Sequence, residues 1–104
     1  FSWEATFAIR NAETAAARGD QTHIAGCAYR ALCCIAQVLF ALNRRYLINE
    51  KGALAEAAGL PLTLPGLSAA TAEVWLLIGR SAFAAVLDEL RRLDRELQAL
   101  VVSA

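Results

Sequence analysis

Residues 83–100 read FAAVLDELRRLDRELQAL, and their pattern decides the class of fold. Apolar residues recur here at intervals of 3, 4, 3, 4 and 3, at Phe83, Val86, Leu90, Leu93, Leu97 and Leu100. A heptad seam of this kind follows one side of an α-helix. On the outer face we expect solvated ion pairs, Asp88 with Arg91 or Arg92 and Arg92 with Glu96. The stretch therefore predicts an amphipathic helix.

Working outward, the chain contains three further long helical segments and a short one. We expect a first helix over 2–18 ended by Gly19, and a second that Asp20 or Thr22 caps and that runs to Arg45 or Tyr46. A short helix over 53–58 stops at Gly59, and the proline-containing stretch 60–66 is a connector. Ser68 or Thr71 can open the next helix, which breaks at 79–81.

Apolar periodicity predicts which faces are buried. Trp3 and Phe7, with several alanines, form the apolar side of the first helix. The second helix carries its stripe at Ile24, Cys27, Ala31, Ile35, Val38, Leu42 and Arg45, flanked by Leu39 and Tyr46. We expect one core that includes Ile35, Val38, Leu42, Trp75, Leu90 and Leu93. Short connectors make successive helices antiparallel neighbours. The predicted fold is all-α, a single domain over 1–104, built as an up-and-down four-helix bundle with a short extra helix between the second and third long helices.

Composition supports this fold and bounds the function. Ala and Leu supply 39 of the 104 residues, whereas Val, Ile and Thr supply 15, so helix formers dominate. A formal net charge of zero gives no electrostatic basis for direct nucleic-acid binding. The most apolar stretch, 31–42, is too short for a membrane span of ~20 residues, and we expect a buried central helix. Because the chain opens on Phe1 rather than Met, we expect residues upstream of it.

Three cysteines, two of them adjacent, lie in an apolar helical pattern, as small buried hydrophobes of a reducing compartment do. We therefore expect a cytoplasmic protein. His23 and Cys27 are four residues apart, but two ligands do not make a metal site, and Cys34 is too distant to complete one. Asp94 and Glu96 point to different sides of a helix, so they are interpreted as surface charge rather than magnesium ligands. No metal and no catalytic residue is assigned.

In the motif RGDQTH, residues 18–23, four residues separate Arg18 from His23. Ribonuclease bundles of the HEPN class use an Arg and a His at this spacing. In that class the pair belongs to a helix start deep in the bundle, where two subunits meet, whereas here it straddles a glycine-containing turn. A HEPN-type ribonuclease-like bundle is therefore kept as an outlying alternative.

A polar segment follows the least polar stretch of the chain. Residues 43–51 hold three cations, one carboxylate, two amides and a phenol. The two arginines of this segment, Arg44 and Arg45, have a structural explanation, because cations in the last turn of a helix complement the helix dipole. The candidate substrate-binding or interdomain residues, which can gather at one end of the bundle, are Asn43, Arg45, Tyr46, Asn49, Glu50 and Lys51.

Residues 19–66 resemble the helical C-terminal domain that follows the catalytic domain in bacterial proteins of the nucleotidyltransferase superfamily, a group largely of unknown function. The stretch reads GDQTHIAGCAYRALCCIAQVLFALNRRYLINEKGALAEAAGLPLTLPG. Its most specific part is LFALNRRYLINEKG. The resemblance implies a bundle related to nucleotidyltransferase substrate-binding domains and an upstream catalytic domain as partner, with Mg and a nucleotide bound there. The superfamily's Gly-Ser turn with paired carboxylates is absent from these residues, so no cofactor is expected in this chain.

Two function hypotheses follow from these observations. In the first, the chain is the non-catalytic substrate-binding or interdomain domain of a nucleotidyltransferase-like protein, with the polar segment facing the cleft. In the second, it is a structural, dimerising bundle without a ligand. At 58% hydrophobic residues so small a chain has more apolar surface than one core readily hides, so a homodimer is expected in either case.

Overall fold

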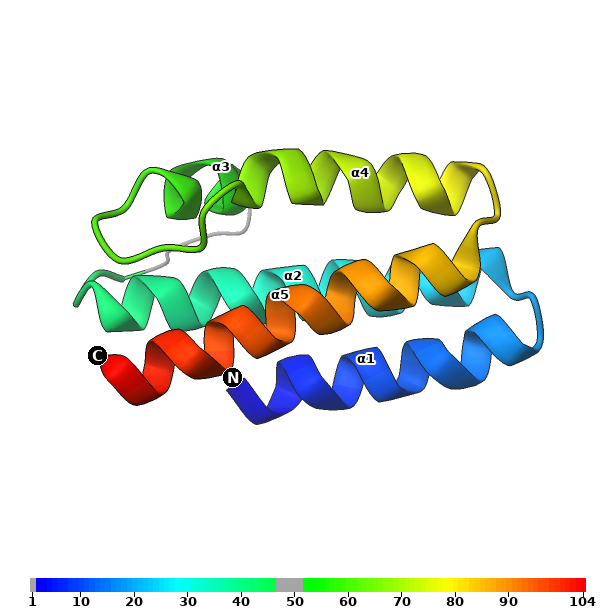
Figure 1. The fold of residues 1–104 in the computed structure, drawn as a ribbon, viewed down its shortest axis with the longest axis horizontal. Coiled ribbons are helices and arrows are strands. Elements are labelled where there is room, and N and C mark those ends of the chain that lie inside the picture. The colour runs from blue at the N-terminus through cyan, green and yellow to red at the C-terminus, as the bar shows by residue number, and fades with distance from the viewer. Residues whose placement is uncertain (1, 47–51) are drawn as a thin grey trace.

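The computed structural model, drawn in Figure 1, describes residues 2–46 and 52–104 of the chain. Its elements are α1 (Ser2–Ala17), α2 (Gln21–Leu42), α3 (Ala53–Ala58), α4 (Leu67–Gly79) and α5 (Phe83–Ser103). No strand occurs within these described ranges. The expected all-α class is confirmed, as are the short helix over 53–58 and the connector that follows it.

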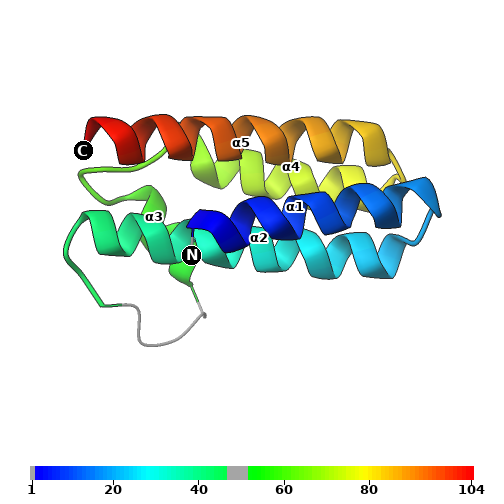
Figure 2. The ribbon, with the colours of Figure 1, turned by 90° about the horizontal axis from the view of Figure 1, so that it is seen from below.

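The helices pack around α2 and α5. In Figure 1, α1 and α4 run in one direction and α2 and α5 run back. Helix α1 contacts α2 and α5, and α4 contacts the same two helices from the other side. In Figure 2, which looks onto the domain from the side of α1, this helix lies in front of α5 and α2. Over the described residues α1 and α4 do not contact each other, so α2 and α5 form the centre of the domain.

The predicted seam of α5 is the inner face of that helix. Val86, Leu90, Leu93 and Leu97 are fully buried, and Phe83 and Leu100 pack against the core at either end. The outer face carries the expected pairs of Arg92 with Glu96 and Arg91 with Asp88. Arg91 also reaches Glu13 of α1 at 2.6 Å, so one of these charges links two helices.

Helix α2 is the longest of the described helices and contributes more buried residues to the core than any other described helix. By length and composition it is the one helix in the described part of the chain that could cross a membrane. However, 61% of its most apolar window is buried inside the domain, which is typical of a core helix. Ile35 and Val38 are buried as predicted, while Leu42 is half-buried against the core.

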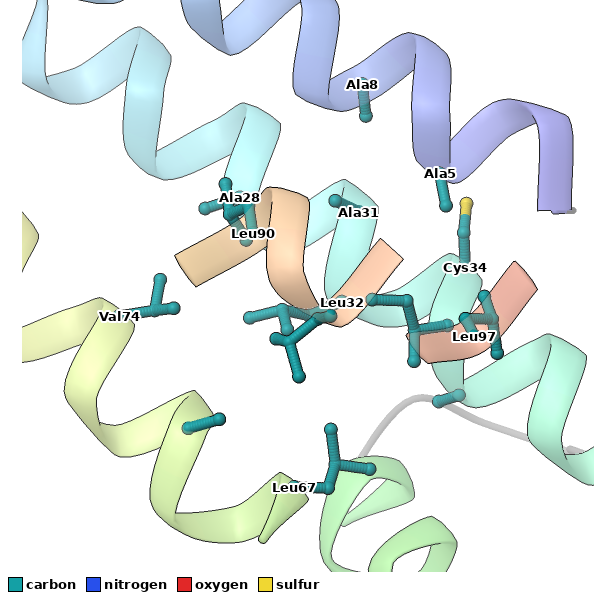
Figure 3. Packing of buried hydrophobic residues seen from close by; sticks show 14 of the residues in the cluster. Ala5, Ala8, Ala28, Ala31, Leu32, Cys34, Leu67, Val74, Leu90 and Leu97 are labelled. Atoms are coloured by element: carbon teal, nitrogen blue, oxygen red, sulfur yellow. The ribbon is translucent and has the colours of Figure 1, made fainter. Parts of the chain in front are cut away.

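Three aromatic residues that we expected in the interior, Trp3, Phe7 and Trp75, are on the surface. Trp75 is 38% exposed, and Val74 and Ile78 fill the core from α4 instead. Trp3 is 71% exposed, because α1 turns its alanine-rich side to α2. In Figure 3, Ala5 and Ala8 of α1 point toward Ala31 and Cys34 of α2. Small side chains let the two helices approach closely, and the large rings of α1 are left outside.

Two expected helix ends were also wrong. Helix α2 stops at Leu42 instead of Arg45 or Tyr46, because Arg44 adopts a left-handed conformation with φ of 56°. Helix α4 begins at Leu67 after Gly66 and has no side-chain cap, so neither Ser68 nor Thr71 opens it. Asp20 caps α2 as predicted and accepts a hydrogen bond from the backbone N–H of His23 at 3.1 Å.

Candidate functional site

The polar segment begins at the end of the domain where α2 finishes. Asn43, Arg45 and Tyr46 are in the described part of the chain, while Asn49, Glu50 and Lys51 lie outside it. The gathering of all six side chains at one end therefore stays a prediction. In Figure 1 this end also holds the connector between α3 and α4 and the C-terminal end of α5.

Asn43 has a structural task that the sequence did not reveal. Its Nδ2 donates hydrogen bonds to the carbonyl oxygens of Leu39 and Leu62, both at 2.7 Å. Its Oδ1 accepts a hydrogen bond from the backbone N–H of Leu62 at 2.9 Å. Both functional groups of the amide are thereby used within the protein. Asn43 fixes the connector to the end of α2 and is a supporting residue rather than a free binding group.

The backbone after Asn43 closes α2 with a Schellman motif. The N–H of Arg45 donates to the carbonyl oxygen of Phe40 at 2.9 Å, and the N–H of Arg44 donates to that of Ala41 at 3.0 Å. This turn ends the helix before Arg45 and Tyr46. Arg45 is exposed, and Tyr46 is 93% exposed. Both side chains are available to a ligand or to another domain.

A shallow groove lies between the connector and the last turns of α5. Its volume is about 530 Å³, and its lining is Thr63, Leu64, Pro65, Glu96, Ala99, Leu100 and Ser103. The Thr63 hydroxyl donates to the carbonyl oxygen of Ala57, and the Glu96 carboxylate pairs with Arg92. The groove is therefore mainly apolar, with one carboxylate at its edge. Asn43 holds the wall of this groove in place through Leu62.

Arg18 and His23 meet at the opposite end of the domain. The turn between α1 and α2 brings Nη2 of Arg18 to 3.2 Å from Nδ1 of His23. A guanidinium group only donates hydrogen bonds, so Nδ1 is the acceptor and the neutral ring carries its proton on Nε2. Both side chains are exposed. His23 is neither buried nor itself a capping side chain.

A pocket on α1 and α5 was missed by the sequence analysis. It has a volume of about 420 Å³ and is lined by Ser2, Trp3, Thr6, Phe7, Arg10 and Gln98. The rings of Trp3 and Phe7 stack with centroids 5.1 Å apart and an interplanar angle of 10°. The spacing of Trp3, Phe7 and Arg10, at i, i+4 and i+7, could have indicated one shared helix face. We assigned that face to the core because it was the more hydrophobic.

A polar network joins α1 to α5 next to this pocket. The Thr6 hydroxyl donates to the Asp94 carboxylate, with the nearer oxygen at 3.1 Å. Nε2 of Gln98 donates to the Ser2 hydroxyl oxygen at 2.7 Å and to Asp94 Oδ1 at 3.2 Å. Asp94 is half-buried, so it serves as an interhelical acceptor and is not simple surface charge.

The cysteines lie in or near the core. Cys27 and Cys34 are buried and Cys33 is half-buried. Burial raises the pKa of the Cys27 thiol. Burial and the neighbouring Glu4 carboxylate raise the pKa of the Cys34 thiol, which lies 4.0 Å from a Glu4 oxygen. Within the ranges that the structure describes, no three His, Cys, Asp or Glu side chains are grouped so that they could hold a metal.

Comparison with known proteins gives no relative for this chain: no family model, no curated protein and no solved structure matches it.

Proposed function

We propose that the chain is a non-catalytic substrate-binding or interdomain domain of a nucleotidyltransferase-like protein, built as an up-and-down four-helix bundle with α3 as its extra helix. The upstream catalytic domain would supply the Mg site and bind the nucleotide, and the protein would be cytoplasmic. The proposal rests on the resemblance of residues 19–66. One structural observation supports it: Asn43 fixes the end of α2 to the connector, and Arg45 and Tyr46 extend from this rigid support.

The chemistry of the exposed groups fits such a role. Arg45 forms no ion pair with any residue of the described ranges, so its guanidinium can bind a phosphate or a carboxylate of another domain. Tyr46 offers a ring and a hydroxyl at the surface. The adjacent groove supplies apolar contact area. Asn49, Glu50 and Lys51 complete the proposed site as predictions from the sequence.

The first test is the sequence encoded upstream of Phe1. A Gly-Ser turn followed by paired carboxylates on a strand is expected there, and a gene without it overturns the proposal. The second test is titration calorimetry between this chain and the upstream segment. Arg45→Ala and Glu50→Ala should weaken docking about tenfold, while the free energy of unfolding changes by less than ~1 kcal/mol. The comparison variants His23→Gln and Cys27→Ser should leave docking intact.

The alternative function is a dimerising bundle, and the outer face of α4 favours it. Trp75 and Leu76 are 38% and 47% exposed there, and the exposed Ala69 and Ala72 extend the face along the helix. Covering such a face with a second copy would remove apolar surface from water. Sedimentation should then give a dimer that Leu76→Glu converts to a monomer. A monomer of ~11 kDa at tens of micromolar would reject this function.

A ribonuclease-like function is the third candidate, and the contact between Arg18 and His23 favours it. When Arg18 donates to Nδ1, the Nε2–H of the neutral ring is left to donate a hydrogen bond to a phosphate oxygen of an RNA, and the guanidinium lies beside it. Cleavage of a single-stranded RNA by the wild-type chain should then be abolished by His23→Gln and retained in Arg80→Ala. RNA left intact by the wild-type chain would reject this candidate.

A further inference from the structure

The pocket on α1 and α5 combines an aromatic surface with polar groups that have no partner among the described residues, and the proposed function uses neither. Trp3 and Phe7 stack on each other, and Trp3 remains 71% exposed, so much of the indole stays open to solvent. An indole ring in this setting is a platform on which another flat ring can stack. The pocket volume of about 420 Å³ is enough for a small organic ligand.

Arg10 places a cation at the edge of this platform. It lines the same pocket as Trp3 and Phe7, two helical turns or ~10 Å from Trp3 by helical rise. Arg30, Arg91 and Arg92 all have carboxylate partners, whereas Arg10 pairs with no acid in the part of the chain that the structure describes. A guanidinium group without a protein partner is suited to bind a phosphate through two parallel hydrogen bonds.

Gln98 presents an acceptor to the same pocket. Nε2 donates to Ser2 and Asp94, and the amide cannot be turned round because its oxygen would then face the Asp94 carboxylate. Oε1 of Gln98 therefore has a fixed position and no partner within the described residues. The Ser2 hydroxyl accepts from Gln98 and keeps its own hydrogen free to donate. The pocket thus offers one acceptor and one donor side by side.

We propose that this pocket binds a small ligand in which a flat aromatic ring carries a phosphate group. The ring stacks on the open face of Trp3, its edge hydrogen-bonds with Oε1 of Gln98 and the hydroxyl of Ser2, and the phosphate pairs with Arg10. A purely apolar occupant would cover Arg10 and Oε1 without replacing their bonds to water, and this is unfavourable. The site is separate from the end of α2, so it goes beyond the proposed function.

The test uses AMP as the probe, with UMP titrated in parallel. Trp75→Phe leaves Trp3 as the single tryptophan of the chain, so its fluorescence reports on the pocket alone. AMP or UMP should quench this fluorescence saturably. Arg10→Ala in the same background should weaken binding at least tenfold, and adenosine, which lacks the phosphate, should bind at least tenfold more weakly than AMP. Inorganic phosphate alone should cause no quenching.

The matched control is Arg80→Ala, because Arg80 is an exposed arginine that follows α4, a helix that does not contact α1 within the described ranges. This variant should bind AMP as the parent does. The proposal is overturned if neither nucleotide quenches saturably, or if Arg10→Ala and Arg80→Ala bind equally well. It is also overturned if the chain without ligand sediments as a dimer that Trp3→Ala converts to a monomer, because a second copy would then cover Trp3.

Discussion

The side-chain amide of Asn43 forms two hydrogen bonds with the backbone of Leu62, a residue 19 positions further along the chain. Nδ2 donates to the Leu62 carbonyl oxygen at 2.7 Å, and Oδ1 accepts from the Leu62 N–H at 2.9 Å. A planar amide satisfies both groups of one peptide at once, which neither a hydroxyl nor a carboxylate can do in this geometry. The connector and the end of α2 are therefore held as one unit.

Replacing Asn43 should destabilise the protein through this contact. Asn43→Ala leaves the N–H and carbonyl groups of Leu62 without their side-chain partner, while the Leu39 carbonyl keeps the backbone N–H of residue 43, and the free energy of unfolding should fall by ~1 to 3 kcal/mol in urea denaturation. Asn11→Ala is the control, because Asn11 is half-buried in α1 and its side chain forms no hydrogen bond in the described structure. Equal effects of the two substitutions would contradict the structural role of Asn43.

A glycine at position 44 should stabilise the protein. Arg44 adopts φ of 56° in the Schellman motif after α2, a conformation that is unfavourable for residues with a Cβ. Arg44→Gly should raise the free energy of unfolding by up to ~1 kcal/mol in urea denaturation. Arg45 has no positive φ, so Arg45→Gly should give no gain. A stabilisation by both glycines would mean that the left-handed turn is not the cause.

The alanine face of α1 should not tolerate larger side chains. Ala8 is 1% exposed and points toward α2 in Figure 3. Ala8→Leu inserts three carbon atoms between closely packed helices and should cost ~1 to 3 kcal/mol of stability by thermal or urea denaturation. Ala17→Leu, at the exposed end of the same helix, should change stability by less than ~0.5 kcal/mol. A stable Ala8→Leu protein would show that α1 does not pack through this face.

Shortening a buried side chain in the seam of α5 should lower the free energy of unfolding strongly. Leu90 is fully buried, and Leu90→Ala should lower the free energy of unfolding by ~2 to 5 kcal/mol. Leu76 is 47% exposed on α4, so Leu76→Ala should cost less than ~1 kcal/mol. Both variants are compared by circular dichroism during urea denaturation. A Leu90→Ala protein that melts like the parent would show that the seam is not buried.

Thiol reactivity should distinguish the three cysteines. Burial raises the pKa of Cys27 and Cys34, so a smaller fraction of each is thiolate at pH 8 than in the unfolded chain. Iodoacetamide should therefore modify the half-buried Cys33 first, as measured by peptide mass spectrometry. Because the folded-state pKa values of Cys27 and Cys34 are raised, the contribution of these thiols to the free energy of unfolding is complete below about pH 8.5. This contribution is lost as the pH rises through the raised pKa values. Equal labelling of all three thiols would contradict this.

The helices and most of their ends could be predicted because their signals are local. The seam from Phe83 to Leu100 repeats every three or four residues, and a helix forms such a stripe whatever its neighbours are. Gly19, Gly59 and the two prolines of the connector mark ends through backbone geometry alone. The end of α2 at Leu42 could not be predicted, because Arg44 adopts a conformation that its residue type disfavours.

The candidate site was only partly predictable, because several of its contacts depend on how the chain folds and not on residue spacing. Arg45 and Tyr46 are exposed as a binding role requires, but Asn43 is occupied by a contact with Leu62 that no spacing in the sequence indicates. The contact between Arg18 and His23 depends on the turn around Gly19. The pocket of α1 and α5 joins residues more than 90 positions apart, such as Ser2 and Gln98.

The sequence by itself determined an all-helical chain, the buried seam of α5 and the central place of α2, because residue propensity and apolar period act within one or two turns of a helix. Only the tertiary structure decided which face of α1 is buried. Hydrophobicity favours Trp3 and Phe7, but α2 offers a surface of alanine and cysteine against which only Ala5, Ala8 and their neighbours fit closely. Close packing between two helices depends on the shape of both, and the shape of the partner is not encoded in either helix alone.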